Sequence, residues 1–123
     1  MQLVVGIVGL FNLLLGFGFL FSPARLAQQF ALVPVGTQGL ATLRADFTAF
    51  FLTGAVFALL GAWRGDDKPL LVPLMLLGTA LTGRTLGIAL DGVGPATFNP
   101  MIAEALMIAV LLSARAVFKR PMR

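Results

Sequence analysis

Residues 3–21 read LVVGIVGLFNLLLGFGFLF, and Asn12 is the only polar side chain in this stretch. A helix that crosses the hydrocarbon layer of a membrane needs about 20 mostly apolar residues, so this stretch is long enough to span a bilayer. Three more stretches of this kind follow at about 40–63, 69–90 and 100–118. Because the runs are continuously apolar rather than alternating, they predict helices and not the strands of a barrel. We predict an all-α fold, an integral membrane four-helix bundle, with residues 1–123 forming a single four-span domain.

The composition of the whole chain supports a membrane protein and limits its chemistry. Of the 123 residues, 59% are hydrophobic and 11% are charged, whereas soluble domains carry about 25% charged residues. The chain has no Cys and no His. Thiolate nucleophiles, cysteine-bound zinc and the usual histidine base or metal ligand are therefore excluded. We predict no metal and no other cofactor.

Basic residues near the ends of the spans predict the orientation of the chain. Six of them lie on one side, in the connection at 64–68 and the C-terminal segment: Arg64, Lys68, Arg115, Lys119, Arg120 and Arg123. Arg25 alone lies on the opposite side. Because basic residues concentrate on the cytoplasmic side of a membrane, we expect both termini in the cytoplasm. Anionic lipid beside the basic tail accounts for the net charge of +4 without a nucleic-acid partner.

The first span has none of the basic residues that open a secretory signal peptide. Residues 1–24 hold no Lys or Arg, and the apolar run is of spanning length. We therefore interpret it as a retained helix rather than a cleaved signal peptide.

The segment after the first span predicts a short surface helix. Pro23 suits the first position of a helix. Leu26 and Phe30 lie one turn apart, whereas Arg25, Gln28 and Gln29 lie toward the other side. We expect a short amphipathic helix at about 23–32 that lies on the outer interface of the membrane.

The charges within the spans are the most informative feature of the sequence. Arg44 and Asp46 belong to the second span, Arg84 to the third and Glu104 to the fourth, and Asp91 ends the third. Ionisable residues inside a membrane are costly and mark candidate functional sites. With a helical rise of about 1.5 Å per residue, Arg84 and Glu104 both lie about 7–10 Å below the outer ends of their helices. We expect Arg44, Arg84 and Glu104 to form the innermost set, with Asp46 and Asp91 nearer to its mouth.

Three interpretations of these five residues stay open. In the first, opposite charges only tie the helices together. In the second, the residues line a ligand or ion pocket on the outer side of the membrane. In the third, they are catalytic, and Glu104 or Asp46 transfers the proton. No nucleophile stands out, so we favour a protein that is not an enzyme. Two arginines argue against a site for a hard metal ion, which needs several carboxylates.

Small residues recur at intervals that allow helices to pack closely. Gly54, Ala58 and Gly61 line one side of the second span, and Gly83 and Gly87 form a small-xxx-small pair in the third. Such residues let helix backbones approach each other in lipid. We expect them to pack inside the bundle, with self-association of the protein as the alternative.

The end of the third span carries a resemblance to a known family. Residues 83–95 read GRTLGIALDGVGP and are followed by Glu104 in the last span. This pattern resembles the bacterial four-helix membrane proteins of domain-of-unknown-function family 4345, and more widely the DoxX-like group. The resemblance implies a four-span bundle in a bacterial cytoplasmic membrane and a shared polar signature at Arg84, Asp91, Gly92 and Glu104. It implies no activity.

These features predict a small multi-pass membrane protein with a binding or accessory role. Arg44, Asp46, Arg84, Asp91 and Glu104 are the candidate ligand-binding residues. The expected partners are the lipid bilayer and a lipid, an amphipathic small molecule or a partner helix held in an outer-leaflet pocket. The alternatives are an isomerase-like membrane enzyme that acts on a hydrophobic substrate, a subunit of an oligomeric transporter, and a purely structural protein.

Overall fold

A computed structural model describes residues 1–119, and this part of the chain is helical with no strand. The elements are α1 (Gln2–Phe21), α2 (Pro23–Gln29), α3 (Gly36–Thr42), the π-helical turn η1 (Leu43–Phe47), α4 (Thr48–Arg64), the 3-10 turn η2 (Lys68–Leu70), α5 (Leu71–Asp91) and α6 (Phe98–Phe118). Because α3, η1 and α4 form one continuous helix, the second span begins at residue 36 rather than at 40. Arg120 and Arg123, which entered the count of basic residues, lie outside the described residues.

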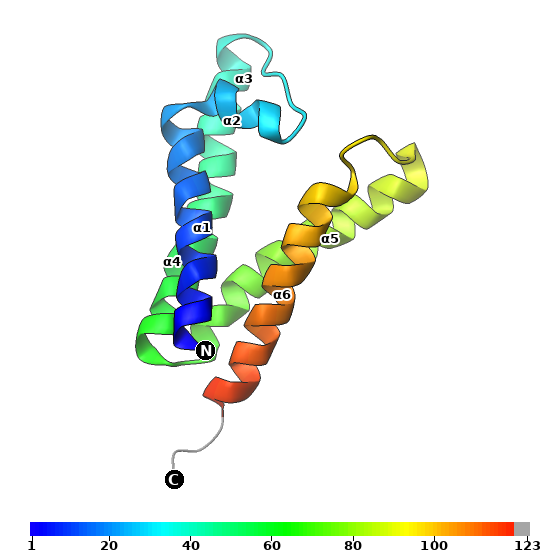
Figure 1. Ribbon diagram of the computed structural model, residues 1–123. Helices are drawn as coiled ribbons and strands as arrows, with labels where there is room; N and C mark the ends of the chain where they lie inside the picture. Colours follow the sequence, from blue (N-terminus) through cyan, green and yellow to red (C-terminus); the bar gives the residue numbers. More distant parts are fainter. Residues whose placement is uncertain (120–123) are drawn as a thin grey trace.

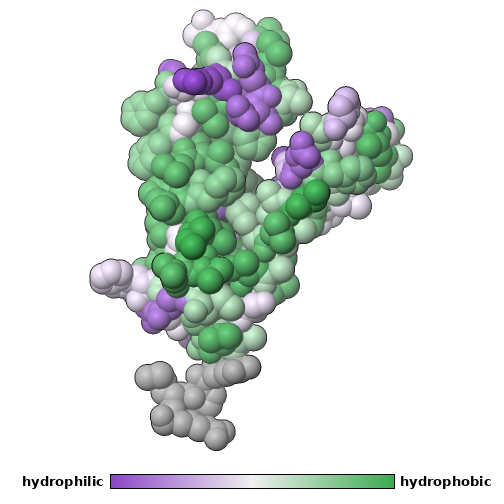
Figure 2. Space-filling model, viewed as in Figure 1, coloured by the Kyte–Doolittle hydropathy of each residue, from purple (hydrophilic) through white to green (hydrophobic). Residues whose placement is uncertain are grey.

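Four of the helices are long and apolar enough to cross a membrane: Gln2–Phe21, Gly36–Arg64, Lys68–Asp91 and Phe98–Phe118. Many of their large apolar side chains point outward. Leu3 is 78% exposed, Phe21 75% and Leu90 73%. Hydrophobic residues cover most of the visible surface, and hydrophilic residues gather toward the two ends (Figure 2). An apolar surface of this extent is unfavourable in water and suits contact with lipid. The fold class is confirmed as an all-α bundle, and the chain is a multi-pass membrane protein.

The four long helices form two hairpins. Helix α1 packs along α4, and α5 packs along α6 (Figure 1). Glycines in α1 allow the first contact to be close, because a Cβ added at Gly9 would lie 2.7 Å from Leu59 Cγ, and one added at Gly16 would lie 2.7 Å from Leu52 Cγ. The two hairpins meet at one end of the molecule and diverge toward the other (Figure 1).

We call the end where the hairpins meet the basic end; it comprises Met1 and residues 64–68 and 115–119. Here Arg115 Nη2 lies 3.3 Å from Asp67 Oδ2, which joins α6 to the connection before α5. Gln2 Nε2 donates a hydrogen bond to the Ala62 carbonyl over 2.9 Å. Beneath these contacts, one buried cluster joins the two hairpins through Val5, Val8, Ala58, Ala62, Leu70, Leu77, Leu111 and Ala114. The predicted placement of these three segments at one end is therefore confirmed.

We call the opposite end, with residues 22–35 and 92–97, the open end. Helix α2 confirms the predicted short helix, although it ends at Gln29. Its apolar side packs on the protein itself: Ala27 is fully buried, and the ring of Phe30, which follows the helix, lies 5.3 Å from that of Phe19, centroid to centroid. A membrane surface is therefore not needed to cover this side of α2.

The predicted role of the small residues is half right. A Cβ at Gly54 would lie 3.5 Å from Leu76 Cδ1, and one at Gly61 would lie 2.5 Å from Leu70 Cδ2, so both glycines face helix contacts. In contrast, Gly83 and Gly87 have no neighbour within 4 Å of an added Cβ. The expectation that they pack inside the bundle is wrong, because they lie on an outward side of α5.

Candidate functional site

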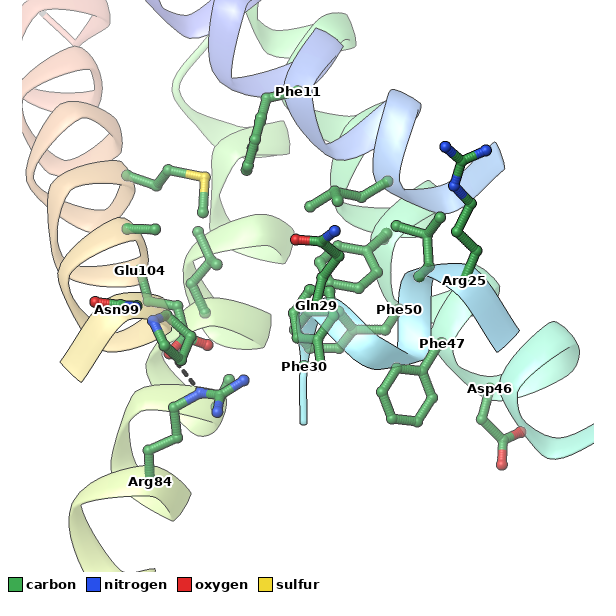
Figure 3. A pocket seen from close by; sticks show the side chains of 18 residues that line it. Phe11, Arg25, Gln29, Phe30, Asp46, Phe47, Phe50, Arg84, Asn99 and Glu104 are labelled. Atoms are coloured by element: carbon green, nitrogen blue, oxygen red, sulfur yellow. Dashed lines mark ion pairs between the residues drawn. The ribbon is translucent and has the colours of Figure 1, made fainter. Parts of the chain in front are cut away.

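The space between the diverging hairpins is a cavity of about 720 Å³. Side chains of α1, α2, η1, α4, α5 and α6 line it. The cluster that joins the hairpins closes the cavity at the basic end, and the hairpins diverge toward the open end (Figure 1). Figure 3 shows the side chains that line it. A cavity of about 300–1,000 Å³ is of the size that small-molecule ligands occupy.

Most of the wall of the cavity is apolar, and aromatic rings form much of it. Phe30, Phe47, Phe50 and Phe51 belong to this wall. The rings also pack on one another: Phe50 meets Phe51 edge-on with 5.0 Å between centroids, and Phe30 lies 5.8 Å from Phe51. Behind them, the fully buried Phe19 stacks on Phe51 at 5.6 Å. Rings held in this way give a firm apolar surface that loses little side-chain freedom when a ligand covers it.

An ion pair lies on the opposite wall. Arg84 Nε of α5 lies 2.8 Å from Glu104 Oε1 of α6 (Figure 3). The side chain of Glu104 is 10% exposed and that of Arg84 is 38% exposed. Both contacting atoms are buried, and neither has a well-aligned hydrogen bond within residues 1–119. The predicted convergence of these two charges at one level is therefore seen directly, and it ties α5 to α6.

The exposed part of Arg84 belongs to the cavity. Its terminal nitrogens point into the open space, across from Gln29 and Phe30 of the other hairpin (Figure 3). Asn99 contributes a second amide to the lining, next to the ion pair. An arginine presents donors only, a carboxylate presents acceptors, and each amide presents both. The polar edge of the cavity can therefore hold a group that donates as well as accepts hydrogen bonds.

Two further charged residues lie at the rim of the cavity. Arg25 of α2 and Asp46 of η1 both belong to its lining, and both are exposed. Their charged ends point away from the Arg84–Glu104 pair (Figure 3). The predicted position of Asp46 near the mouth agrees with this arrangement.

The expected position of Arg44 in the innermost set is wrong. Arg44 is exposed and does not line the cavity; its Nε instead donates to the carbonyl of Leu20, at 2.8 Å, in the last turn of α1. The cause is the π-helical turn η1, which holds one residue more than an α-helical turn. Counting back from the buried Thr48 therefore places Leu43, which is 5% exposed, on the inner side in place of Arg44. Arg44 satisfies a carbonyl that has no partner within its own helix.

Asp91 also stays outside the cavity. It is exposed at the end of α5, beyond the part of the helix that faces the other hairpin. It shares a helical face with Arg84 but not a site with it, because the hairpins are far apart at this level. Within residues 1–119, no three acidic residues come together to offer a cluster for a cation.

Three polar lining residues were not predicted from the sequence: Arg25, Gln29 and Asn99. Their helices were expected, but Arg25 and Gln29 were assigned to the polar side of a surface helix. Only the turn of the chain after α1 brings α2 back over the cavity. No local signal in the sequence specifies this turn.

No protein-family model, no curated protein and no solved structure matches this chain. The site is therefore defined by its own geometry.

Proposed function

We propose that this protein is a binding protein of the membrane, which holds an amphipathic small molecule or a lipid in the cavity between its two hairpins. The observation that carries the proposal is the cavity itself: about 720 Å³, walled by phenylalanines on one side and bearing the Arg84–Glu104 pair on the other. An apolar cavity with a few convergent polar groups is the usual form of a small-molecule site.

The same proposal includes a location. The resemblance of residues 83–95 to the four-helix family supports a bacterial cytoplasmic membrane. The excess of basic residues at the basic end supports placing that end in the cytoplasm, together with both termini. In this orientation the cavity opens in the outer leaflet, where a lipid or an amphipathic molecule enters from the side.

A catalytic role is less well supported by the geometry. Arg84 engages Oε1 of Glu104 and stabilises the charged carboxylate, so only Oε2 remains open to a substrate. Asp46 is exposed at the rim, away from the apolar wall. We therefore favour binding over proton transfer by either residue.

Native mass spectrometry of the purified protein tests this proposal. We expect a bound mass of lipid size on the wild type, and its loss in Ala103→Trp, because Ala103 lines the cavity and a Trp would fill it. Ala105→Trp is the matched control: Ala105 is exposed on the same helix and does not line the cavity. A thermal melt in the same detergent checks that both variants fold.

The proposal fails if wild type and both variants carry no ligand, or if all three carry the same ligand to the same extent. A second copy of the chain, or a bound partner protein lost only from Ala103→Trp, would show that the cavity holds a helix and would also contradict a small-molecule site.

A further inference from the structure

The charges around the cavity cancel. The lining contains two basic residues, Arg25 and Arg84, and two acidic ones, Asp46 and Glu104. The inner pair is in direct contact at 2.8 Å. The outer two are of opposite sign. Both lie at the rim on the other hairpin, and their charged ends point in different directions (Figure 3). Among the described residues, the lining therefore carries no net charge that a ligand would have to neutralise.

This balance disfavours a charged headgroup. An anion drawn to Arg84 would compete with Glu104 and leave one negative charge uncompensated beside an apolar wall. A cation drawn to Glu104 would leave a positive charge in the same way. Uncompensated charge is costly in a site of low polarity, even when an oppositely charged group is near. An uncharged group avoids this cost.

The hydrogen-bonding groups favour a headgroup that both donates and accepts. Arg84 offers donors, Glu104 offers acceptors, and the amides of Gln29 and Asn99 offer both. Hydroxyl and amide groups on a ligand have the same double character. Such a headgroup bridges Arg84 and Glu104 without separating them.

The volume sets the size of the apolar part. At about 30 Å³ for each water-sized group, 720 Å³ holds about 24 such groups. This volume is sufficient for one long acyl chain with a small headgroup. The aromatic wall gives the chain its apolar contact.

We propose that the ligand is an amphiphile that places one acyl chain along the aromatic wall and an uncharged, hydroxyl- or amide-bearing headgroup against Arg84 and Glu104. This inference rests on the proposed function and adds the chemical class of the ligand.

Three probes with the same chain length test the inference: a monoacylglycerol, the corresponding lysophosphatidic acid and an alkylamine. They differ in headgroup charge, which is zero, negative and positive. Binding to the full-length protein in detergent is measured by native mass spectrometry over a concentration series. We expect the wild type to bind the monoacylglycerol at least about tenfold more tightly than either charged probe, a modest factor for one uncompensated charge.

Single charge deletions should then switch the preference. In Glu104→Gln the positive charge of Arg84 is left over, so we expect the lysophosphatidic acid to become the best ligand. In Arg84→Gln the negative charge of Glu104 is left over, and we expect the alkylamine to become the best ligand. Asp67→Asn is the matched control, because it deletes an acidic partner of Arg115 at the basic end and should leave the ranking unchanged.

The possible outcomes separate this inference from the proposed function. If the wild type binds none of the three probes, the proposed function itself fails. If it binds a charged probe as well as the monoacylglycerol, binding stands and the uncharged headgroup is wrong. If Asp67→Asn shifts the ranking as far as Glu104→Gln does, the selectivity does not come from the pair. If one of the variants does not fold, the order of the three affinities for the wild type alone tests the uncharged headgroup.

Discussion

Breaking the Arg84–Glu104 pair should destabilise the protein measurably. At 2.8 Å and an effective dielectric constant of about 20, two unit charges attract each other by about 6 kcal/mol before the cost of desolvation. Removing one partner of a buried pair costs about 3–5 kcal/mol. Because the side chain of Arg84 is 38% exposed, we expect the lower end of this range, about 3 kcal/mol, for Arg84→Met, which leaves Glu104 unpaired.

Glu104→Met should lower the free energy of unfolding by less than Arg84→Met does. The double variant should lower it by no more than Glu104→Met alone. Glu104→Met leaves the more exposed Arg84 charge facing the cavity, and we expect a loss of about 1 kcal/mol. The double variant leaves no unpaired charge, and we expect about 1 kcal/mol there as well. The coupling energy between the two sites is then about 3 kcal/mol.

A double-mutant cycle measures this coupling directly. The free energy of unfolding of the wild type, both single variants and the double variant is obtained from reversible unfolding in mixed micelles, followed by circular dichroism. A coupling energy below about 0.5 kcal/mol would mean that the two charges do not stabilise each other and that the ion pair does not hold α5 to α6.

Two further predictions concern the packing of the first hairpin, each with a matched control. Gly9→Ala should lower the free energy of unfolding by about 1–3 kcal/mol, since the added Cβ would lie 2.7 Å from Leu59 Cγ. Gly83→Ala has free space and should not destabilise the fold. Chemical unfolding compares the two variants, and equal losses would contradict the close packing of α1 on α4. Phe19→Ala should lower the free energy of unfolding by about 3–5 kcal/mol because this ring is fully buried. Phe21→Ala, at a ring that is 75% exposed, should lower it by less than about 1 kcal/mol. A smaller loss for Phe19→Ala than for Phe21→Ala would exclude the aromatic cluster as part of the core.

The sequence was sufficient to predict the spans because their signal is local. Residues 3–21 are nineteen consecutive residues with a single polar side chain. In lipid, a continuously apolar stretch of this length pairs its backbone hydrogen-bonding groups within itself by forming a helix. The divergence of the hairpins could not be predicted in this way. It depends on which sides of α5 and α6 meet the other hairpin. The spacing of Gly83 and Gly87 is typical of a helix-packing surface, yet neither has a neighbour within 4 Å of an added Cβ.

The candidate site was predicted in part. Arg84 and Glu104 were placed at one level by their distances from the helix ends, and this estimate needed only the rise of a regular helix. Arg44 was misplaced because its assignment to the inner face, which it would share with Thr48, assumed an α-helical period through residues 43–47, where the chain forms a π-helical turn. Arg25 was missed because its place in the lining depends on how the chain turns back after α1, which is a tertiary contact rather than a local pattern.

Photolabelling tests the central claim, that the cavity between the hairpins holds an acyl chain. A monoacylglycerol with a photoreactive group in its chain is added to the protein in vesicles, and the labelled residues are identified by peptide mass spectrometry. Met107 lines the cavity, whereas Leu14 is 65% exposed on the outer side of α1 and does not line it. We expect labelling of Met107 that an excess of unlabelled monoacylglycerol abolishes, and labelling of Leu14 that the excess does not change. Equal labelling of both residues, unaffected by the competitor, would contradict it.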